Sequence, residues 1–261
     1  MDASAPRIKF CAITDPADAR LAVEAGAWAL GVILWPRSRR RCPLEVAVAV
    51  AAEHRRRAEI VGVFVNQTLD EVARAADEIG LTMLQLHGDE GPAFCAEAAR
   101  RTGCRVIKAA RVRSGADIRA LAAYHTDFHL LDSHVPGMRG GTGETWSWEL
   151  AREHRGPPVI LSGGLNAGNV AQAIAVVRPF AVDVATGVED PDRAPRKDPE
   201  RLRAFAAAVA DAGGLGETGA RRPLAPGAQR PLAPGAQRLA GRLPEPDAGR
   251  VAGRAAGRAG A

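Results

Sequence analysis

Two side chains that could transfer protons lie in or next to apolar segments that are far apart in the sequence. Cys11 lies in the alternating segment 8–13, and Asp132 ends the apolar run 128–131. A thiolate can accept a proton and a carboxylic acid can donate one. A carboxylate that ends an apolar strand is costly to place unless it is paired or used. Cys11 and Asp132 are therefore candidates for a proton acceptor and a proton donor.

Each candidate also has a structural explanation. Cysteine is commonly a small buried apolar residue, and Asp132 could simply cap the turn into Pro136 and Gly137. Lys9 shares a strand face with Cys11, two residues earlier, and a nearby ammonium group lowers the pKa of a thiol. We hypothesise that Lys9 lowers the pKa of Cys11 toward the range in which the thiol can accept a proton.

Two glycine turns within residues 159–187 have the pattern of a phosphate site. The apolar run 159–161 ends in a glycine pair, where bare backbone can approach an anion. A helical run at 169–177 follows, and its first N–H groups face the same space. The next apolar run, 180–184, leads into a second small-residue turn, which parallel strands would place beside the first. A glycine pair alone would equally cap a strand. The predicted phosphate contacts are the backbone amides of Gly163, Gly164, Thr186 and Gly187.

Short strand-like runs alternate with helix-like runs as far as residue 210. Eight units of about 25 residues fit a closed parallel barrel, so we expect a single α/β domain of the (β/α)8 TIM barrel class. An open doubly wound sheet is the alternative, but it would normally have a GxGxxG turn after the first strand, and Thr14-Asp15-Pro16 has no glycine. The expected strands are 8–13, 29–34, 60–65, 83–86, 105–109, 128–132, 159–161 and 180–184. The expected helices are 16–25, 44–56, 69–79, 91–101, 115–123, 148–153, 169–177 and 199–210.

Active residues of such barrels lie at the carboxyl ends of the strands. Strands one and six are three places apart around an eight-membered ring, so Cys11 and Asp132 would face each other across the mouth. Arg40 stands in a run of three arginines; such a run is mostly a solvated face, but one guanidinium could clamp a carboxylate. His87 is expected to be a hydrogen-bonded structural histidine. The glycine-rich segment 137–143 is expected to form a mobile lid beside Asp132.

The last fifty residues differ in composition from the rest, so we expect a catalytic domain at 7–211 and a tail at 212–261. The tail repeats RPLAPGAQ at 222–229 and 230–237 and has no aromatic residue. Such a low-complexity Arg/Pro/Gly/Ala segment cannot bury enough apolar surface to offset its ordering entropy, so we expect disorder. Its 8 arginines and 3 acidic residues carry a net +5, which equals the net charge of the whole chain. The barrel is therefore near neutral, and its charge does not favour a nucleic-acid partner.

Cysteine spacing and the start of the chain set further expectations. The four cysteines show no CxxC spacing and no neighbouring histidines of the metal-binding type, so we expect neither a metal site nor disulfides. The first ten residues lack the apolar core of a signal peptide, and no apolar run approaches the length of a membrane span. We expect a cytoplasmic protein without a membrane or nucleic-acid partner, and the choice between monomer and homodimer stays open.

From residue 8 to residue 210 the chain resembles the phosphoribosylanthranilate isomerase family, barrel enzymes of tryptophan biosynthesis. KFCAIT resembles the KICGxT of the family, PRSRR its PxSxR, and VGVFVN and LQLHGDE its third and fourth strands. LLDSHVPGMRGGTGETW is similar to the long sixth-strand signature. LSGGLNAGNV and VDVATGVE are similar to the phosphate strands, and the KD at 197–198 to the KD before the last helix.

This resemblance implies an isomerase that needs no cofactor. Its substrate would be the small phosphosugar N-(5-phosphoribosyl)anthranilate, and an Amadori rearrangement would give 1-(2-carboxyphenylamino)-1-deoxyribulose 5-phosphate. Cys11 would be the general base and Asp132 the general acid, while Arg40 would hold the anthranilate carboxylate. The implied substrate-binding residues are Arg40, Gly141, Gly163, Gly164, Thr186 and Gly187.

The sequence departs from the family pattern at three places. Ala12 replaces the glycine after the proposed base, Thr186 replaces a serine but keeps the hydroxyl, and 146–148 read Trp-Ser-Trp where Phe-Asp-Trp is usual. Indole-glycerol-phosphate synthase and the histidine-pathway isomerase are related phosphate-binding barrels, but the latter would be expected to have paired aspartates on strands one and five. Those strands carry Cys11 and Lys108-Ala109. A non-catalytic or differently specific phosphosugar-binding barrel is the remaining alternative.

Overall fold

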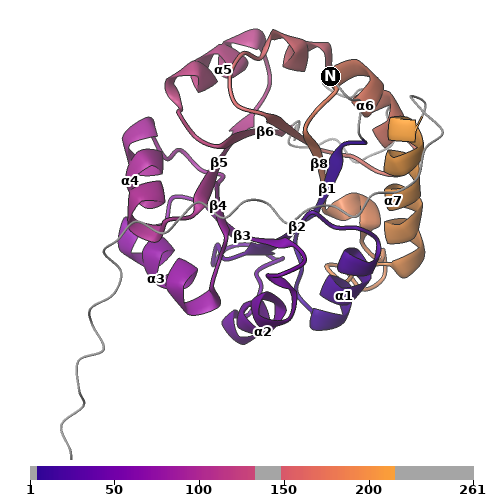
Figure 1. The fold of residues 1–261 in the computed structure, drawn as a ribbon, viewed down its shortest axis with the longest axis horizontal. Coiled ribbons are helices and arrows are strands. Elements are labelled where there is room, and N and C mark those ends of the chain that lie inside the picture. The colour runs from indigo at the N-terminus through magenta and orange to yellow at the C-terminus, as the bar shows by residue number, and fades with distance from the viewer. Residues whose placement is uncertain (1–4, 133–147, 215–261) are drawn as a thin grey trace, which may run out of the picture. The chain divides into compact units, whose positions relative to one another are not determined.

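Eight parallel strands close into a barrel in the computed structural model, which describes residues 5–132 and 148–214. The strands are β1 (Arg7–Phe10), β2 (Ala29–Ile33), β3 (Glu59–Phe64), β4 (Met83–Leu86), β5 (Arg105–Arg111), β6 (Phe128–Asp132), β7 (Val159–Ser162) and β8 (Ala181–Val184). Each strand pairs with its neighbours in the sequence, and β1 pairs with β8 to close the ring (Figure 1). The predicted (β/α)8 barrel is confirmed.

Helices form a layer around the outside of the barrel (Figure 1). They are α1 (Pro16–Glu24), α2 (Leu44–His54), α3 (Leu69–Ile79), α4 (Pro92–Thr102), α5 (Gly115–Ala120), α6 (Val170–Val177) and α7 (Pro199–Gly214), with 3-10 helices η1 (Leu121–Ala123), η2 (Trp148–Glu153) and η3 (Thr186–Val188). Each expected helix is found, although the segment expected at 148–153 is a 3-10 helix. The helices on either side of β6 in the sequence, α5 with η1 before it and η2 after it, are therefore each shorter than the other α-helices around the barrel.

Polar caps fix where the helices begin and end. Asp15 accepts a hydrogen bond from the amide of Ala17 at the start of α1. Thr68 and Glu71 form a reciprocal capping box at the start of α3. Gly80 ends α3 in the left-handed conformation that glycine adopts without steric cost. These local signals set the lengths of the helices and hence the points at which the chain re-enters the barrel.

The barrel interior changes from apolar to polar along the strands. One buried cluster consists of strand residues that point inward: Ala29, Val61, Met83, Ile107, Ala109, Phe128, Leu130, Ile160 and Ala181. Two residues further along a strand is again the inner face, and on β4, β6, β7 and β8 the side chain there is polar. The polar residues include Gln85, Asp132, Ser162 and Asp183, together with Lys9 on β1. The carboxyl ends of the strands therefore hold the reactive groups over an apolar floor.

Aromatic rings close the opposite end of the barrel. Trp28, Phe128 and Phe180 lie at the amino ends of β2, β6 and β8, with ring centroids 5.1–5.7 Å apart. The Arg7 guanidinium lies 4.7 Å from the centre of the Phe180 ring, and that of Arg105 lies 5.7 Å from the Phe128 ring. We define these three rings as the aromatic floor.

The last helix is longer than the expected helix 199–210. Helix α7 continues through residues 212–214, which the sequence analysis assigned to the tail. Six alanines lie between residues 204 and 212, and alanine is the strongest helix former, so nothing local ends the helix at 211. The rest of the expected tail, 215–261, and the expected lid at 137–143 lie outside the described residues.

A buried histidine, His129, pairs with a half-buried one, His154, behind β6. His129 Nδ1 lies 2.8 Å from His154 Nε2, and His129 Nε2 lies 3.1 Å from the carbonyl oxygen of Tyr124. His129 is fully buried. Burial, and then the proximity of His154, lowers the pKa of His129 from 6.5 to about 4. Burial also lowers the pKa of His154.

Acidification is therefore expected to destabilise the fold between about pH 6.5 and pH 4. In this window the unfolded chain binds a proton at residue 129 that the folded chain excludes, so the free energy of unfolding falls as the pH drops. The largest loss from His129 alone is about 3 kcal/mol. Urea unfolding at several pH values measures it. The His129→Gln variant should show a weaker pH dependence than the wild type, whereas His125→Gln, at an exposed histidine nearby, should match it. Identical pH dependence in all three proteins would contradict the assignment.

Candidate active site

Cys11 and Asp132 both lie at the carboxyl ends of their strands. Cys11 directly follows β1, and its amide donates to the carbonyl of Val184 at 2.8 Å. Asp132 is the last residue of β6 and is paired in register with Ser162 of β7. The strand order places β8 and β7 between β1 and β6, so the predicted separation of three places around the ring is confirmed.

A buried charged cluster lies beside Cys11 inside the barrel. Lys9 Nζ donates to Asp183 Oδ1 at 2.7 Å, and Ser162 Oγ donates to Asp183 Oδ2 at 3.0 Å. A Cβ atom added to Gly31 would lie 2.8 Å from Cys11 Sγ and 3.0 Å from Lys9 Nζ. The thiol and the ammonium group thus border the same small space, which only glycine at position 31 leaves open.

The expected low pKa of the Cys11 thiol is wrong, although Lys9 acts on it in the predicted direction. The pKa of Cys11 is raised above its ordinary value, first because burial disfavours the thiolate and also because the Asp183 carboxylate repels it. Lys9 and, more weakly, Lys197 do act in the predicted direction and lower the pKa. The sequence indicated the partner correctly but not the burial, nor the carboxylate that neutralises this partner.

Replacing Lys9 by Met is expected to raise the pKa of Cys11 further. The variant loses the positive charge that favours the thiolate. It also removes the ammonium partner of Asp183, so the negative charge of that carboxylate near Cys11 is no longer compensated. Ultraviolet thiolate absorbance followed against pH, as a difference from the same protein carrying Cys11→Ser, isolates this one thiol. Equal Cys11 pKa values in wild type and Lys9→Met would show that Lys9 has no influence on the thiol.

Asp132 is hydrogen-bonded to a histidine of fixed orientation. His87 Nε2 lies 3.2 Å from Asp132 Oδ2, and Gln85 Nε2 lies 2.8 Å from His87 Nδ1. With the Gln85 amide donating to Nδ1, a neutral ring carries its proton on Nε2 and donates it to the carboxylate. His87 is thus a hydrogen-bonded histidine, as expected, and it contacts the candidate acid directly.

A second buried ion pair holds the loop that carries His87. Lys108 Nζ donates to Glu90 Oε2 at 2.9 Å and to the Gly88 carbonyl at 2.7 Å. The same carboxylate accepts the amides of Asn66 and Gly88. A carboxylate with this many donors restrains the backbone after β3 and after β4, next to His87, which contacts Asp132 of β6.

The two predicted phosphate turns lie against each other. Gly163 and Gly164 have φ angles of 94° and 63°, which favour glycine. A Cβ on Gly187 would collide with the carbonyl oxygen of Leu165, so the turn after β8 touches the turn after β7. Within the described residues, the amides of Gly163, Gly164, Thr186 and Gly187 donate to no protein acceptor. These amides are available to an anion. The predicted contact Gly141 lies outside the described residues.

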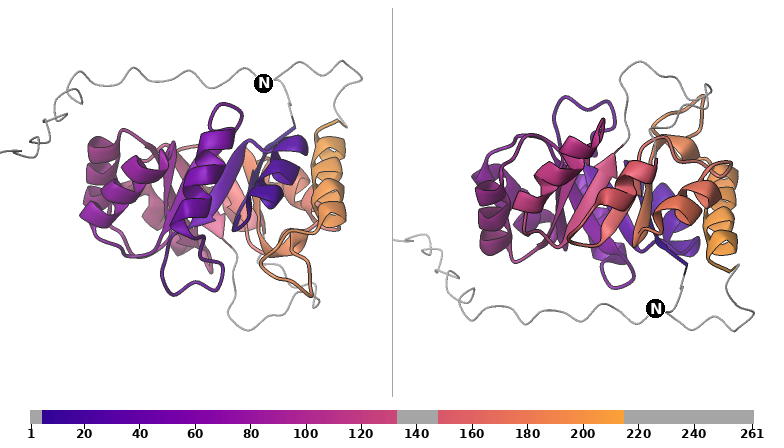
Figure 2. Two further views of the ribbon diagram at one scale, coloured as in Figure 1. Left: turned by 90° about the horizontal axis from the view of Figure 1, so that it is seen from below. Right: turned by 90° about the horizontal axis from the view of Figure 1, so that it is seen from above.

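Arg40 meets a buried glutamate at the mouth. Its Nε and Nη2 donate to the two carboxylate oxygens of Glu189 at 2.7 and 2.9 Å. Lys197 Nζ lies 3.7 Å from the same carboxylate. Figure 2 shows that the loops after β2 and β8, which carry Arg40 and Glu189, protrude from the same end of the barrel. The predicted carboxylate clamp thus points into the site but already holds a carboxylate of the protein.

Ala12 adopts a backbone conformation that favours glycine. Its φ angle is 60°, and its side chain is fully buried. A left-handed conformation costs an ordinary residue about 1–2 kcal/mol. The departure from the glycine of the family pattern therefore places local strain directly after Cys11, while the backbone keeps the path that a glycine would take.

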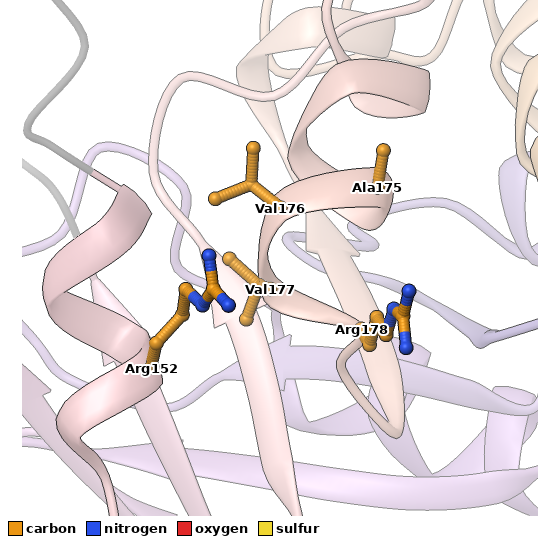
Figure 3. A pocket seen from close by; sticks show the side chains of 5 residues that line it. All are labelled: Arg152, Ala175, Val176, Val177 and Arg178. Atoms are coloured by element: carbon orange, nitrogen blue, oxygen red, sulfur yellow. The ribbon is translucent and has the colours of Figure 1, made fainter.

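The hollow in Figure 3 lies apart from these groups. It has a volume of about 400 Å³ and lies between η2 and the carboxyl end of α6. Its lining residues are Arg152, Ala175, Val176, Val177 and Arg178, none of which is a predicted site residue. In the part of the chain that the structure describes, no set of three or more His, Cys, Asp or Glu side chains could hold a metal ion. No helix of that part is long and apolar enough to span a bilayer.

Fold and site together are those of a (β/α)8 barrel with polar, ionisable groups at the carboxyl ends of its strands. The family model of N-(5'-phosphoribosyl)anthranilate isomerase matches residues 8–208. The chain belongs to this family.

Relatives of known name and structure agree with this assignment. The N-(5'-phosphoribosyl)anthranilate isomerase of Citrifermentans bemidjiense is 46% identical over 199 residues, which are 76% of this chain and 93% of that protein. The crystal structure of the Thermotoga maritima phosphoribosyl anthranilate isomerase superimposes with a TM-score of 0.70 at 38% identity, covering 78% of this chain and 98% of that one. A further solved isomerase, in complex with reduced 1-(o-carboxyphenylamino)-1-deoxyribulose 5-phosphate, is 36% identical with a TM-score of 0.68 and the same coverage.

Proposed function

We propose that this protein performs the Amadori rearrangement of N-(5-phosphoribosyl)anthranilate with Cys11 as general base and Asp132 as general acid. Membership of the family identifies the reaction as the isomerisation step of tryptophan biosynthesis. The observation that carries the residue roles is the position of the two groups. Cys11 directly follows β1 and Asp132 ends β6, and these strands are three places apart in the closed barrel.

The acid acts first in the proposed sequence. Asp132, in its protonated form, donates its proton to the ring oxygen of the ribofuranose, and the ring opens to an iminium ion. His87 holds the carboxyl group in one orientation through the bond at 3.2 Å. Because Gln85 fixes the imidazole in turn, the acid needs little reorganisation when the proton leaves.

The base completes the reaction. Cys11, as the thiolate, removes the proton from C2 of the open chain, which the positive nitrogen has made acidic. The resulting enolamine becomes the ketone of 1-(2-carboxyphenylamino)-1-deoxyribulose 5-phosphate. Lys9 and Lys197 both favour the thiolate electrostatically, which offsets part of the cost of ionising a buried thiol.

Contacts remote from the reacting carbons anchor the substrate. Free amides at the touching turns after β7 and β8 would bind the phosphate, and Arg40 would bind the anthranilate carboxylate. Gly141 would contribute from the segment after β6. Binding energy at both ends of the substrate places its C1–C2 region between acid and base. The proposed phosphate donors are Gly163, Gly164, Thr186 and Gly187.

The remaining parts of the proposal concern the setting of the enzyme. It acts in the cytoplasm as a monomer or homodimer, with its phosphosugar as the only partner that the reaction needs. The catalytic domain runs from residue 7 to the end of α7, and the residues after it take no part in the chemistry.

The purified full chain tests the reaction directly. N-(5-phosphoribosyl)anthranilate is fluorescent, so its conversion is followed as a loss of fluorescence, and the product is compared with authentic 1-(2-carboxyphenylamino)-1-deoxyribulose 5-phosphate by chromatography. Fluorescence that decays no faster than in the same solution without protein would refute the function. Such a result would favour a non-catalytic phosphosugar-binding barrel.

A further inference from the structure

One edge of the Arg40 guanidinium is fully engaged by Glu189. Nε and Nη2 make two parallel bonds to the two carboxylate oxygens, the arrangement that best fixes a planar guanidinium. The Glu189 side chain is only 6% exposed, whereas that of Arg40 is 31% exposed. The remaining group, Nη1, is free of this pair. A carboxylate that enters the mouth therefore meets a guanidinium whose position is already set.

Glu189 is itself held firmly to the chain around it. Its amide donates to the carbonyl of Thr186 at 3.1 Å, and its backbone forms an antiparallel bridge with Lys197. Lys197 Nζ lies 3.7 Å from the carboxylate and donates to the Ala185 carbonyl at 3.1 Å. Hydrogen bonds from Glu189 and Lys197 thus hold the backbone at the start of η3, and Glu189 directly follows its end.

The same short helix carries the second phosphate turn. Thr186 and Gly187 are the first two residues of η3, and Gly187 lies against the carbonyl of Leu165 in the first phosphate turn. Glu189 follows η3 directly. The Glu189 carboxylate therefore links Arg40 to the short helix whose backbone amides face the phosphate.

We propose that Glu189 is a positioning residue that sets the separation between the carboxylate-binding and phosphate-binding ends of the substrate site. This inference rests on the proposed function, in which Arg40 binds the anthranilate carboxylate. The charges support it: Arg40 and Lys197 together outweigh Glu189 by one positive charge, so the site attracts a carboxylate while Arg40 stays in place. A substrate with a different distance between its carboxylate and its phosphate could bind at only one of the two ends of the site.

Kinetics of the Glu189→Gln variant test the proposal. Glutamine keeps the shape but cannot accept both guanidinium bonds, so Arg40 loses its fixed position. We expect KM for N-(5-phosphoribosyl)anthranilate to rise about tenfold while kcat changes less than threefold. The inhibition constant of inorganic phosphate should stay within twofold of the wild type, because the phosphate turns are intact. Glu189→Asp, which keeps the charge but draws Arg40 toward the barrel wall, should raise KM similarly.

The matched control is Glu53→Gln, which breaks another guanidinium–carboxylate pair of the same geometry. Arg20 Nε and Nη2 donate to Glu53 at 2.8 and 3.1 Å on the outer helices. The kinetic constants of the Glu53→Gln variant should equal those of the wild type. Unchanged KM in a folded Glu189→Gln or Glu189→Asp variant overturns the proposal, and so does a phosphate inhibition constant that rises in parallel with KM. If one variant does not fold, the other decides. A wild type without turnover would instead refute the proposed function.

Discussion

Replacing Asp132 by Asn is expected to lower kcat about 10³-fold, because the amide has no acidic proton to give to the ring oxygen. The side chain keeps its shape, and the Asn Oδ1 atom can still accept the bond from His87 Nε2. KM should therefore change little. The measurement is steady-state kinetics by the fluorescence assay, with single-turnover traces to separate chemistry from product release.

Asp77→Asn serves as the matched control for this substitution. Asp77 is an exposed residue of α3, and the same chemical change there should leave both kinetic constants as in the wild type. Retention of more than a tenth of the wild-type kcat by Asp132→Asn would remove Asp132 from the role of general acid, even if the reaction itself is correct.

The second large effect is expected at Cys11. In Cys11→Ser the hydroxyl cannot ionise near neutral pH, so the abstraction of the C2 proton loses its base and kcat should fall by about 10²–10⁴-fold. Cys104→Ser is the control. Its thiol is half-buried and donates to the Leu81 carbonyl at 3.2 Å, away from the site. Full activity of Cys11→Ser would show that another group takes the proton.

The pH dependence of the rate gives an independent check on Cys11. Burial holds the pKa of this thiol above its ordinary value, so only a minor fraction is thiolate at neutral pH. Thiolate becomes more abundant as the pH rises toward the thiol pKa, but protonated Asp132 becomes scarcer, so the wild-type rate should change little over this range. The residual rate of Asp132→Asn, which depends on the thiolate alone, should rise. A residual rate that falls over the same range would mean that the base is already ionised and that a different group limits the reaction.

Most of the fold follows from local patterns that are visible in the sequence. The apolar runs 60–65 and 83–86 are short, and the structure places β3 at Glu59–Phe64, one residue earlier than expected, and β4 at Met83–Leu86, as expected. Parallel strands separated by helices leave few topologies, since the connections are right-handed. Eight such units therefore predict the ring, and the ring alone predicts which strand ends are close.

The contacts that adjust the site do not follow from local patterns. Asp183 lies in an apolar strand that faces Lys9 only once β8 closes on β1, 174 residues away in the sequence. Glu189 and Arg40 are separated by 149 residues. For Lys9 and Asp183, the signal that could have indicated the pair is a single charge flanked by apolar residues in a strand, which burial permits only when the charge is paired. Their partners depend on the closed barrel, and so does the balance of burial and charge at Cys11.

The aromatic floor has a consequence for how this enzyme can change. Its three rings and the arginines over them lie at the amino ends of the strands, while every proposed reactive group lies at the carboxyl ends. Thermal stability thus depends on residues at one end of the barrel, and substrate specificity depends on residues at the other end. Substitutions among Trp28, Phe128 and Phe180 should shift the melting temperature at nearly constant turnover, which leaves the loops at the mouth free to diverge.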